Sequence, residues 1–97
     1  MSFSFHPEAE NEFDAARDFY DEREFGLGEG FLEEVYSTIS RIVDHPNSWP
    51  RYSHRTRRCL CNRFPYSVIY RHLPGQVVVY AVAHQSRKPG YWKDRLE

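Results

Sequence analysis

The fold of this chain is decided by one stretch, residues 63–92, which reads RFPYSVIYRHLPGQVVVYAVAHQSRKPGYW. Residues 66–72 are rich in apolar and β-branched side chains, and residues 76–83 repeat this character with valine, alanine and tyrosine. Between these two runs, Pro74-Gly75 is a turn signal. The stretch therefore predicts a β-hairpin.

Two amphipathic helices are predicted before the hairpin. Pro7 suits the first position of a helix, and the apolar stripe of this helix consists of Ala9, Phe13, Ala16 and Tyr20. We expect Gly26 and Gly28 to end it. A second helix should begin near Glu29, with a broader apolar face made of Leu32, Val35, Tyr36, Ile39, Ile42 and Val43. The short glycine-rich link predicts an antiparallel helical hairpin.

The remaining strands complete an α+β fold. Residues 2–5 alternate polar and apolar side chains, and residues 57–62 form a further strand that leads into the hairpin. The order strand, helix, helix, strand, strand, strand predicts an antiparallel meander sheet with the first strand added, covered on one face by the helical hairpin. Residues 1–97 form a single domain, because a chain this short buries only one modest core.

The composition is that of a globular protein of the cytoplasm. No signal peptide is recognisable, and no apolar run approaches the roughly 20 residues that cross a bilayer. Cys59 and Cys61 lie two apart on a predicted strand, an awkward geometry for a disulfide, so we expect buried free thiols. With a histidine they could begin a zinc site, but a fourth ligand at a recognisable spacing is missing. Without a P-loop or a dinucleotide fingerprint either, we expect no cofactor and no metal.

Charge is divided unequally along the chain. Residues 1–48 hold twelve acidic and three basic side chains, whereas residues 49–97 hold two acidic and ten basic ones. The halves therefore carry about −9 and +8. This division predicts an acidic helical layer and a basic strand layer that suits phosphate or an acidic protein. The alternative is that the two layers form surface ion pairs with each other.

Candidate functional residues gather after the last predicted strand. His84 could act as a general acid or base, or cap the end of the strand. Tyr91 and Trp92 could stack on a base or a target side chain, or close the edge of a small core. Cations that suit a phosphate backbone, or alternatively form a solvated face, are Arg57, Arg58, Arg63, Arg87, Lys88, Lys93 and Arg95.

Four segments resemble one family of proteins. FPYSVIYR at residues 64–71 and VVVYAVAHQSRKPGYW at residues 77–92 are similar to the RelE/ParE superfamily of bacterial type II toxins, and most of all to its ParE-like, plasmid-stabilisation branch. GLGEGFLEEV at residues 26–35 and HPNSWP at residues 45–50 extend the resemblance over nearly the whole chain. It implies a toxin that is neutralised by a cognate antitoxin.

The superfamily contains two activities. Its ribosome-dependent ribonucleases carry an arginine at the position of Ser67 and a second at that of Gln85, and the resemblance would assign His84, Arg87 and Tyr91 to catalysis. Because both arginines are replaced, stabilisation of the developing phosphate charge is weakened. The ParE-like branch implies inhibition of DNA gyrase instead, without catalysis. An mRNA endonuclease acting on the ribosome is the alternative, and a non-toxic module that only binds an antitoxin is a third.

Two surfaces are predicted for the partners. Phe19, Phe25 and Phe31 lie outside the main apolar stripes of the helices, so we expect them to bind the antitoxin. Pro89-Gly90 should turn the chain so that Tyr91 and Trp92 fold back. The target would then meet the cations left in solvent, which are Arg87, Lys88, Lys93 and Arg95.

Overall fold

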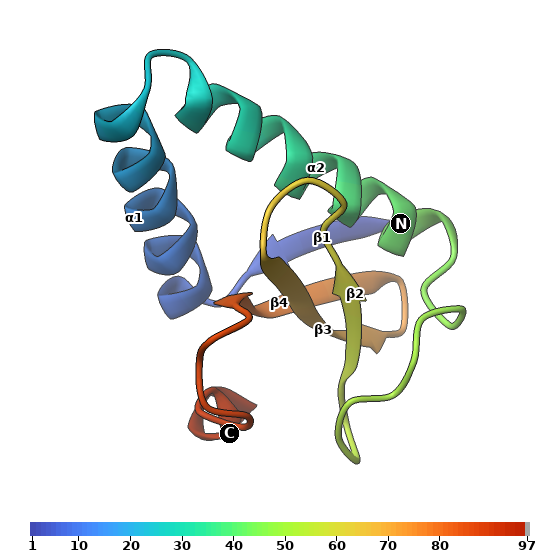
Figure 1. Ribbon diagram of the computed structural model, residues 1–97. Coiled ribbons are helices and arrows are strands. Elements are labelled where there is room, and N and C mark those ends of the chain that lie inside the picture. The colour runs from blue at the N-terminus through green and yellow to red at the C-terminus, as the bar shows by residue number, and fades with distance from the viewer. Residues whose placement is uncertain (97) are drawn as a thin grey trace.

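The computed structural model describes residues 1–96 (Figure 1). Its elements follow the predicted order, with a short 3-10 helix at the end, and the α+β class is confirmed. Their bounds are β1 Ser2–Phe5, α1 Pro7–Arg23, α2 Leu27–Asp44, β2 Arg57–Leu60, β3 Tyr66–Leu73, β4 Gln76–His84 and η1 Lys93–Leu96. Within residues 1–96, no helix combines the length and the hydropathy that a membrane crossing requires.

The sheet is mixed rather than purely antiparallel. Its strands lie in the order β1-β4-β3-β2, and β2, β3 and β4 form the predicted antiparallel meander. β1 instead pairs in parallel with β4, with Ser2 opposite Gln76 and Phe5 opposite Val79. The prediction of an antiparallel meander sheet is therefore wrong at β1. The reason is that α1 follows β1 directly and packs against β4, so β1 joins the sheet at the outer edge of β4.

The link between the helices lies earlier than predicted. α1 ends at Arg23 and α2 begins at Leu27, rather than near Glu29. Gly26 is the N-cap of α2 and has a φ of 83°, in the left-handed region that favours glycine. From this link the two helices diverge, α2 passing across the sheet and α1 descending beside the C-terminal end of β4 (Figure 1).

Gly28 lies inside α2 and does not end a helix. Its amide donates a hydrogen bond of 2.9 Å to Oδ1 of Asp21 in α1. A Cβ atom at this position would collide with the Asp21 carboxylate and with the carbonyl oxygen of Arg17. The glycine therefore permits the close approach of the two helices.

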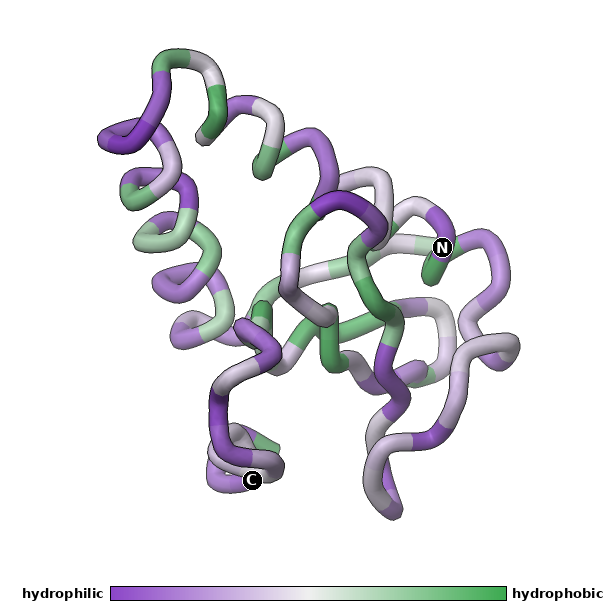
Figure 2. Tube along the Cα trace, viewed as in Figure 1, coloured by the Kyte–Doolittle hydropathy of each residue, from purple (hydrophilic) through white to green (hydrophobic). Residues whose placement is uncertain are grey.

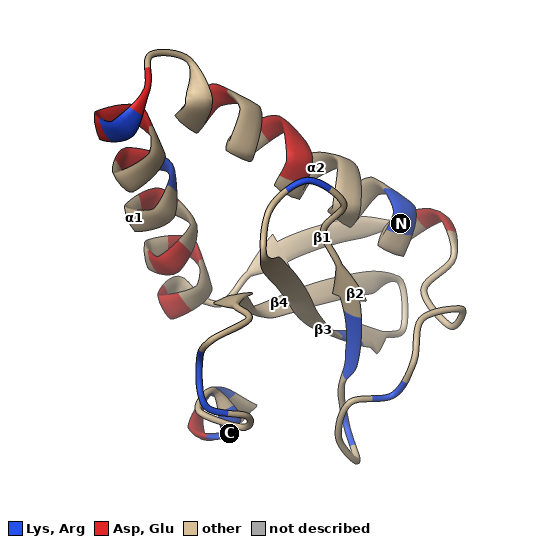
Figure 3. Cartoon of the chain, in the orientation of Figure 1, with Lys and Arg blue, Asp and Glu red and all other residues tan. Residues whose placement is uncertain are grey.

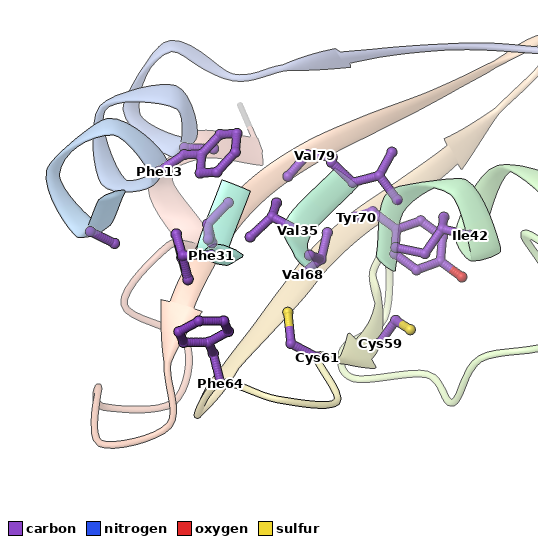
Figure 4. Close-up of a cluster of buried hydrophobic side chains, with 14 of the residues drawn as sticks. Phe13, Phe31, Val35, Ile42, Cys59, Cys61, Phe64, Val68, Tyr70 and Val79 are labelled. Carbon is purple, nitrogen blue, oxygen red and sulfur yellow. The ribbon is translucent and has the colours of Figure 1, made fainter. Parts of the chain in front are cut away.

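The main core lies between the helices and one face of the sheet (Figure 4). Phe13 of α1 and Val35 of α2 lie on the predicted apolar stripes, and both are buried. Cys59 and Cys61 are buried free thiols, as predicted, and burial raises the pKa of both. The hydroxyl of Thr38 in α2 lies 3.4 Å from Sγ of Cys61 and joins the helix to the sheet.

β4 changes its inward-facing side at a β-bulge. Tyr70 pairs with Val79 and Ile69 pairs with Ala81, which leaves Tyr80 as an extra residue in β4. The valines of β4 contribute to the main core on both sides of this bulge. The alanines after it, starting with Ala81, lie in a second cluster of buried residues.

The second cluster is smaller, and the C-terminal tail supplies its largest side chain. Trp92 is 2% exposed and packs with Ile69, Ala81 and Ala83. Its predicted return to the body of the protein is confirmed. Figure 2 shows the hydrophobic residues concentrated in the strands, with hydrophilic residues along the loop after α2 and along the tail.

Candidate functional site

The charge division of the sequence is also a division in space. Figure 3 shows the acidic residues on α1 and on the first half of α2, and the basic residues on β2, the loop before it and the C-terminal tail. The acidic helical layer and the basic remainder therefore lie on different parts of the surface. An anionic partner would be attracted to the second of them.

A pocket of about 300 Å³ lies on this basic side, between β2, the ends of β3 and β4, and the tail. Its floor is formed by Leu60, Ser67, Ile69 and Ala83. The residues predicted for the site that the structure brings together here are His84, Arg58, Arg87, Lys88, Tyr91 and Trp92.

Four predicted site residues lie outside this pocket. Arg57 donates a hydrogen bond of 2.8 Å to the carbonyl oxygen of Trp49 and so has a structural partner. Arg63 is exposed in the loop between β2 and β3, and Lys93 lines a neighbouring depression. Arg95 is not solvated, which corrects the prediction, because its side chain is only 10% exposed and pairs with Glu12.

Aromatic rings hold two of the arginines in the pocket. The guanidinium of Arg58 lies 4.2 Å from the centre of the Tyr52 ring, and that of Arg87 lies 3.8 Å from the centre of the Tyr91 ring. Tyr52 in turn packs on Trp92, with ring centres 5.9 Å apart. These stacks restrict the two guanidinium groups and leave their positive charge in place.

His84 caps the end of β4. Its Nδ1 accepts a hydrogen bond of 3.0 Å from the amide of Ser86 and lies 2.8 Å from the Ser86 hydroxyl. The Tyr66 ring packs edge-on against the imidazole at 5.1 Å. Because Nδ1 is an acceptor, the proton of the neutral ring lies on Nε2. The observed contacts of His84 are thus those of a residue that caps the end of a strand.

Ser67 and Gln85 are both in the pocket, where the ribonucleases of the superfamily would place arginines. Ser67 is 5% exposed and lies in the floor, so an anion bound there would meet a hydroxyl instead of a cation. The backbone amide of Gln85 donates a hydrogen bond of 2.9 Å to the carbonyl oxygen of Pro65, which fixes the backbone at the rim of the pocket. Two neutral side chains therefore line the pocket at the positions where the resemblance would imply arginines in a ribonuclease.

The sequence reasoning missed Glu12, the acceptor that joins the tail to α1. Its carboxylate accepts two hydrogen bonds from Arg95, of 2.9 and 3.0 Å, and one of 2.6 Å from the Tyr91 hydroxyl. It also accepts a hydrogen bond of 3.1 Å from the backbone amide of Val82. A signal was available, because Glu12 lies three residues after Ala9 and four before Ala16, at the margin of the apolar stripe.

This network replaces a missing strand neighbour. β1 pairs only with the first half of β4, up to Val79, so the outer edge of β4 beyond it has no strand beside it. Glu12 accepts from the amide of Val82, and Arg95 donates 2.9 Å to the carbonyl oxygen of Tyr80 at the bulge. The ion pair therefore satisfies backbone groups that would otherwise be left unpaired.

The environment around Glu12 raises the pKa of both Tyr91 and Arg95. Burial, together with the hydrogen bond to the Glu12 carboxylate, raises the pKa of Tyr91. Burial acts to lower the pKa of Arg95, but its hydrogen bonds to Glu12, together with the charge interactions with Glu12, Tyr91 and Glu8, outweigh this and raise the pKa. Tyr91 is thus held as a neutral hydroxyl and Arg95 as a cation.

The predicted antitoxin residues do not share one environment. Phe25 is fully exposed at 102% and Phe19 is 47% exposed, with the guanidinium of Arg23 4.3 Å from the centre of the Phe19 ring. Phe31 is 0% exposed and belongs to the main core. The expectation that Phe31 lies outside the core is therefore wrong, because Phe31 lies four residues before Val35 and so on the buried face of α2.

Comparison with known proteins agrees with the geometry. Residues 3–89 match the family described as the ParE toxin of the type II toxin-antitoxin system, parDE. A solved structure, the chromosomal ParDE toxin-antitoxin system from P. aeruginosa, has the same fold, with a TM-score of 0.70 and 19% sequence identity. The alignment covers 87% of this chain and 95% of that one. No curated protein sequence matches the chain.

The family match spans both helices, the whole sheet and most of the basic pocket. It therefore covers the elements from which the observed architecture is built. The chain belongs to the ParE toxin family of type II toxin-antitoxin systems.

Proposed function

We propose that this protein is a toxin of the bacterial cytoplasm that arrests growth by inhibiting DNA gyrase, and that a cognate antitoxin neutralises it. Membership of the ParE family supports this proposal. The observation that supports the choice of gyrase over RNA is that Glu12 binds Tyr91 and Arg95, while the neutral side chains of Ser67 and Gln85 line the pocket beside Tyr91.

Cleavage of RNA needs groups that this pocket lacks or keeps occupied. A phosphoryl-transfer transition state is stabilised by cations placed where its charge develops. Ser67 and Gln85 supply none, and Arg95 is already neutralised by Glu12. The hydroxyl of Tyr91 donates to the same carboxylate, and its raised pKa makes it a poor acid at neutral pH. Recognition of a protein target, by contrast, uses the remaining cations without any of this chemistry.

An antitoxin is the second partner of the proposal. The structural relative is titled as a toxin-antitoxin system, and the exposed Phe19 and Phe25 at the end of the helical pair here provide an apolar surface. A groove of about 290 Å³ lies beside Phe19, with Ala15 and Ala16 in its wall. A helical or extended antitoxin segment that docks there would bury well over roughly 1,000 Å² in all.

One observation favours the endonuclease alternative. His84, Arg87 and Tyr91 do share the wall of one pocket, as a ribonuclease would require. The activity would then depend on His84, whose Nε2 is the only ring nitrogen not facing Ser86. The non-toxic alternative predicts neither gyrase inhibition nor cleavage.

Two parallel assays test the proposal. The purified protein is added to a DNA gyrase supercoiling reaction and to a reconstituted translation reaction in which cleavage of mRNA on the ribosome is followed by primer extension. We expect inhibition in the first and no cleavage in the second. In cells, His84→Ala should leave growth arrest largely intact. Robust ribosome-dependent cleavage that His84→Ala abolishes would overturn the proposal, and inactivity in both assays would identify a non-toxic module.

A further inference from the structure

We propose that the basic pocket binds an acidic segment of the target protein, with a carboxylate between Arg58, Arg87 and Lys88 and a neighbouring apolar side chain on the floor. This inference rests on the proposed function, because it assigns the segment to DNA gyrase. It deepens that function by stating the chemistry through which the target is recognised.

The charge of the pocket is only partly compensated. Its wall contains three cations and no Asp or Glu side chain. Within the described part of the chain, Arg58 and Lys88 form no ion pair, and the closest carboxylate oxygen to Arg87 is that of Glu12 at a distance of 4.0 Å. Each cation in a concave, partly apolar site strengthens the field of the others, so an anionic side chain is the complement that the pocket lacks.

The cations are held ready for a planar anion. Stacking on Tyr52 and Tyr91 restricts the guanidinium groups of Arg58 and Arg87, so little side-chain entropy is lost when a ligand binds. A guanidinium binds a carboxylate through two parallel hydrogen bonds, a geometry that a lysine cannot reproduce. The pocket is thereby suited to the carboxylate of an Asp or Glu residue.

The aromatic rings argue against a nucleic-acid ligand. Binding of single strands relies on free aromatic faces on which bases stack. Here the Tyr52 and Tyr91 rings are already engaged by Arg58 and Arg87, and Trp92 is 2% exposed. One face of each tyrosine ring is therefore already covered by a guanidinium, which reduces the aromatic surface on which a base could stack.

The floor of the pocket fits a peptide. Leu60 is 49% exposed, a high value for a large aliphatic residue, and it lines the pocket together with Ile69 and Ala83. In an extended peptide, side chains that are neighbours on one face are two residues apart. One acidic and one apolar residue at that spacing would place a carboxylate among the cations and an apolar group on Leu60. This is the recognition element that we expect in the target.

Charge reversal at Arg58, matched with reversal at an arginine outside the pocket, tests the inference. Arg58→Glu should raise the concentration of toxin that half-inhibits gyrase supercoiling by more than about tenfold, as loss of an enclosed charge pair does. Arg58→Lys keeps the charge but not the planar fork and should have an intermediate effect. Arg55→Glu makes the same charge change on an exposed loop residue and should change the value by less than about twofold.

A second arm examines the ligand directly. A capped peptide in which Glu and Leu lie two residues apart, separated by serine, and a single-stranded DNA oligonucleotide of equal charge are titrated into the isotope-labelled protein. We expect the peptide alone to shift the amide resonances of Ser67, Ala83 and Gln85, in the wild type and in Arg55→Glu but not in Arg58→Glu. Shifts caused only by the oligonucleotide would overturn the proposal in favour of nucleic acid, and the absence of shifts with both ligands would overturn it outright.

The role of the pocket and the proposed function can be disproved separately. If the wild-type protein inhibits gyrase and a well-folded Arg58→Glu inhibits it equally, the pocket is not the recognition site, while the proposed function stands. If the peptide binds the pocket but the wild-type protein never inhibits gyrase, the proposed function is wrong and the assignment of the acidic segment to gyrase is overturned with it. Thermal melting of each variant identifies any loss of potency that comes from unfolding.

Discussion

The hydroxyl of Tyr91 donates a hydrogen bond of 2.6 Å to the carboxylate of Glu12, a residue 79 positions earlier in the chain. The same carboxylate binds Arg95, whose other hydrogen bond reaches the carbonyl oxygen of Tyr80. One acidic side chain of α1 therefore holds both the tail and the free edge of β4. Because Tyr91 also forms part of the pocket wall, the shape of the pocket depends on α1.

Removal of Glu12 should destabilise the whole protein. Glu12→Ala leaves Arg95, with a side chain 10% exposed, only the exposed carboxylate of Glu8 at 3.8 Å. Loss of the charged hydrogen bonds from Arg95 and Tyr91 should cost about 3 kcal/mol. Urea unfolding followed by circular dichroism measures this change. Asp14→Ala removes an exposed carboxylate from the same helix and should alter the free energy of unfolding by less than about 0.5 kcal/mol. Equal effects of the two variants would contradict the role given to Glu12.

Alkaline pH should weaken the fold through Tyr70. Its hydroxyl donates 2.6 Å to the carbonyl oxygen of Pro46, and burial raises its pKa from 10.0 to about 12. Above pH 10 the unfolded chain loses this proton while the folded protein keeps it, so stability falls as the pH rises from about 10 to about 12. The loss is on the order of 2–3 kcal/mol over this range. Below pH 10 Tyr70 should contribute no pH dependence.

The control for this effect is Tyr70→Phe. At pH 7 the variant should be less stable by roughly 1 kcal/mol, the contribution of one hydrogen bond. Its stability should then decline less steeply above pH 10 than that of the wild type, and the difference isolates Tyr70 from Cys59, Cys61 and Tyr91, whose pKa values burial also raises. Denaturant titrations at several pH values compare the two proteins. Parallel declines would show that Tyr70 is not the residue responsible.

The antiparallel meander could be predicted from the sequence, but the β-bulge and the parallel pairing of β1 could not. The hairpin of residues 66–83 was predictable, because two β-branched runs flank a Pro-Gly turn. The bulge at Tyr80 was not, since a run of Val, Ala and Tyr that is buried on both faces carries no alternation to reveal a change of side. The parallel pairing of β1 depends on where the helices return the chain, which is a property of tertiary packing.

The candidate site was predictable to the same extent. The tail sequence placed Arg87, Lys88 and Trp92 together because they are neighbours in the chain, and all three line the pocket. Glu12 and Tyr52 lie far away in sequence and reach the site only through folding. Arg95 was expected in solvent because cations near the end of a chain are normally exposed. It is instead enclosed, because it pairs with Glu12 of α1.

The contact between the helices can be tested with two glycines of α2. Gly28→Ala would force its Cβ into Asp21 and the backbone of α1, so we expect a loss of about 1–3 kcal/mol. Gly30→Ala has room, because the closest atom to its Cβ is Nη2 of Arg63 at 3.6 Å. It should gain about 0.5–1 kcal/mol from helix propensity. Thermal melting measures both, and a stabilising Gly28→Ala would contradict the close approach of the helices.

Substitutions of Phe25 and Phe31 should have different effects on antitoxin binding and on stability. Phe25→Ser removes a fully exposed ring, so we expect unchanged stability and weaker binding of the cognate antitoxin. Phe31→Ala opens a cavity in the core and should cost about 3–5 kcal/mol whatever its effect on binding. Isothermal titration calorimetry with the antitoxin, alongside thermal melting, compares the variants. Full affinity in Phe25→Ser would place the antitoxin elsewhere on the surface.

The tail combines a residue that stabilises the fold with residues that we expect to contact the target. Trp92→Ala removes the largest side chain of the second cluster and should cost about 3–5 kcal/mol, which lowers solubility irrespective of function. Reversal of both Arg87 and Lys88 to Glu should change stability little, since the first is 53% exposed and the second lies on the surface. It should nevertheless abolish growth arrest. Toxicity in cells is measured beside thermal melting, and full toxicity in a well-folded double reversal would show that the tail is only structural.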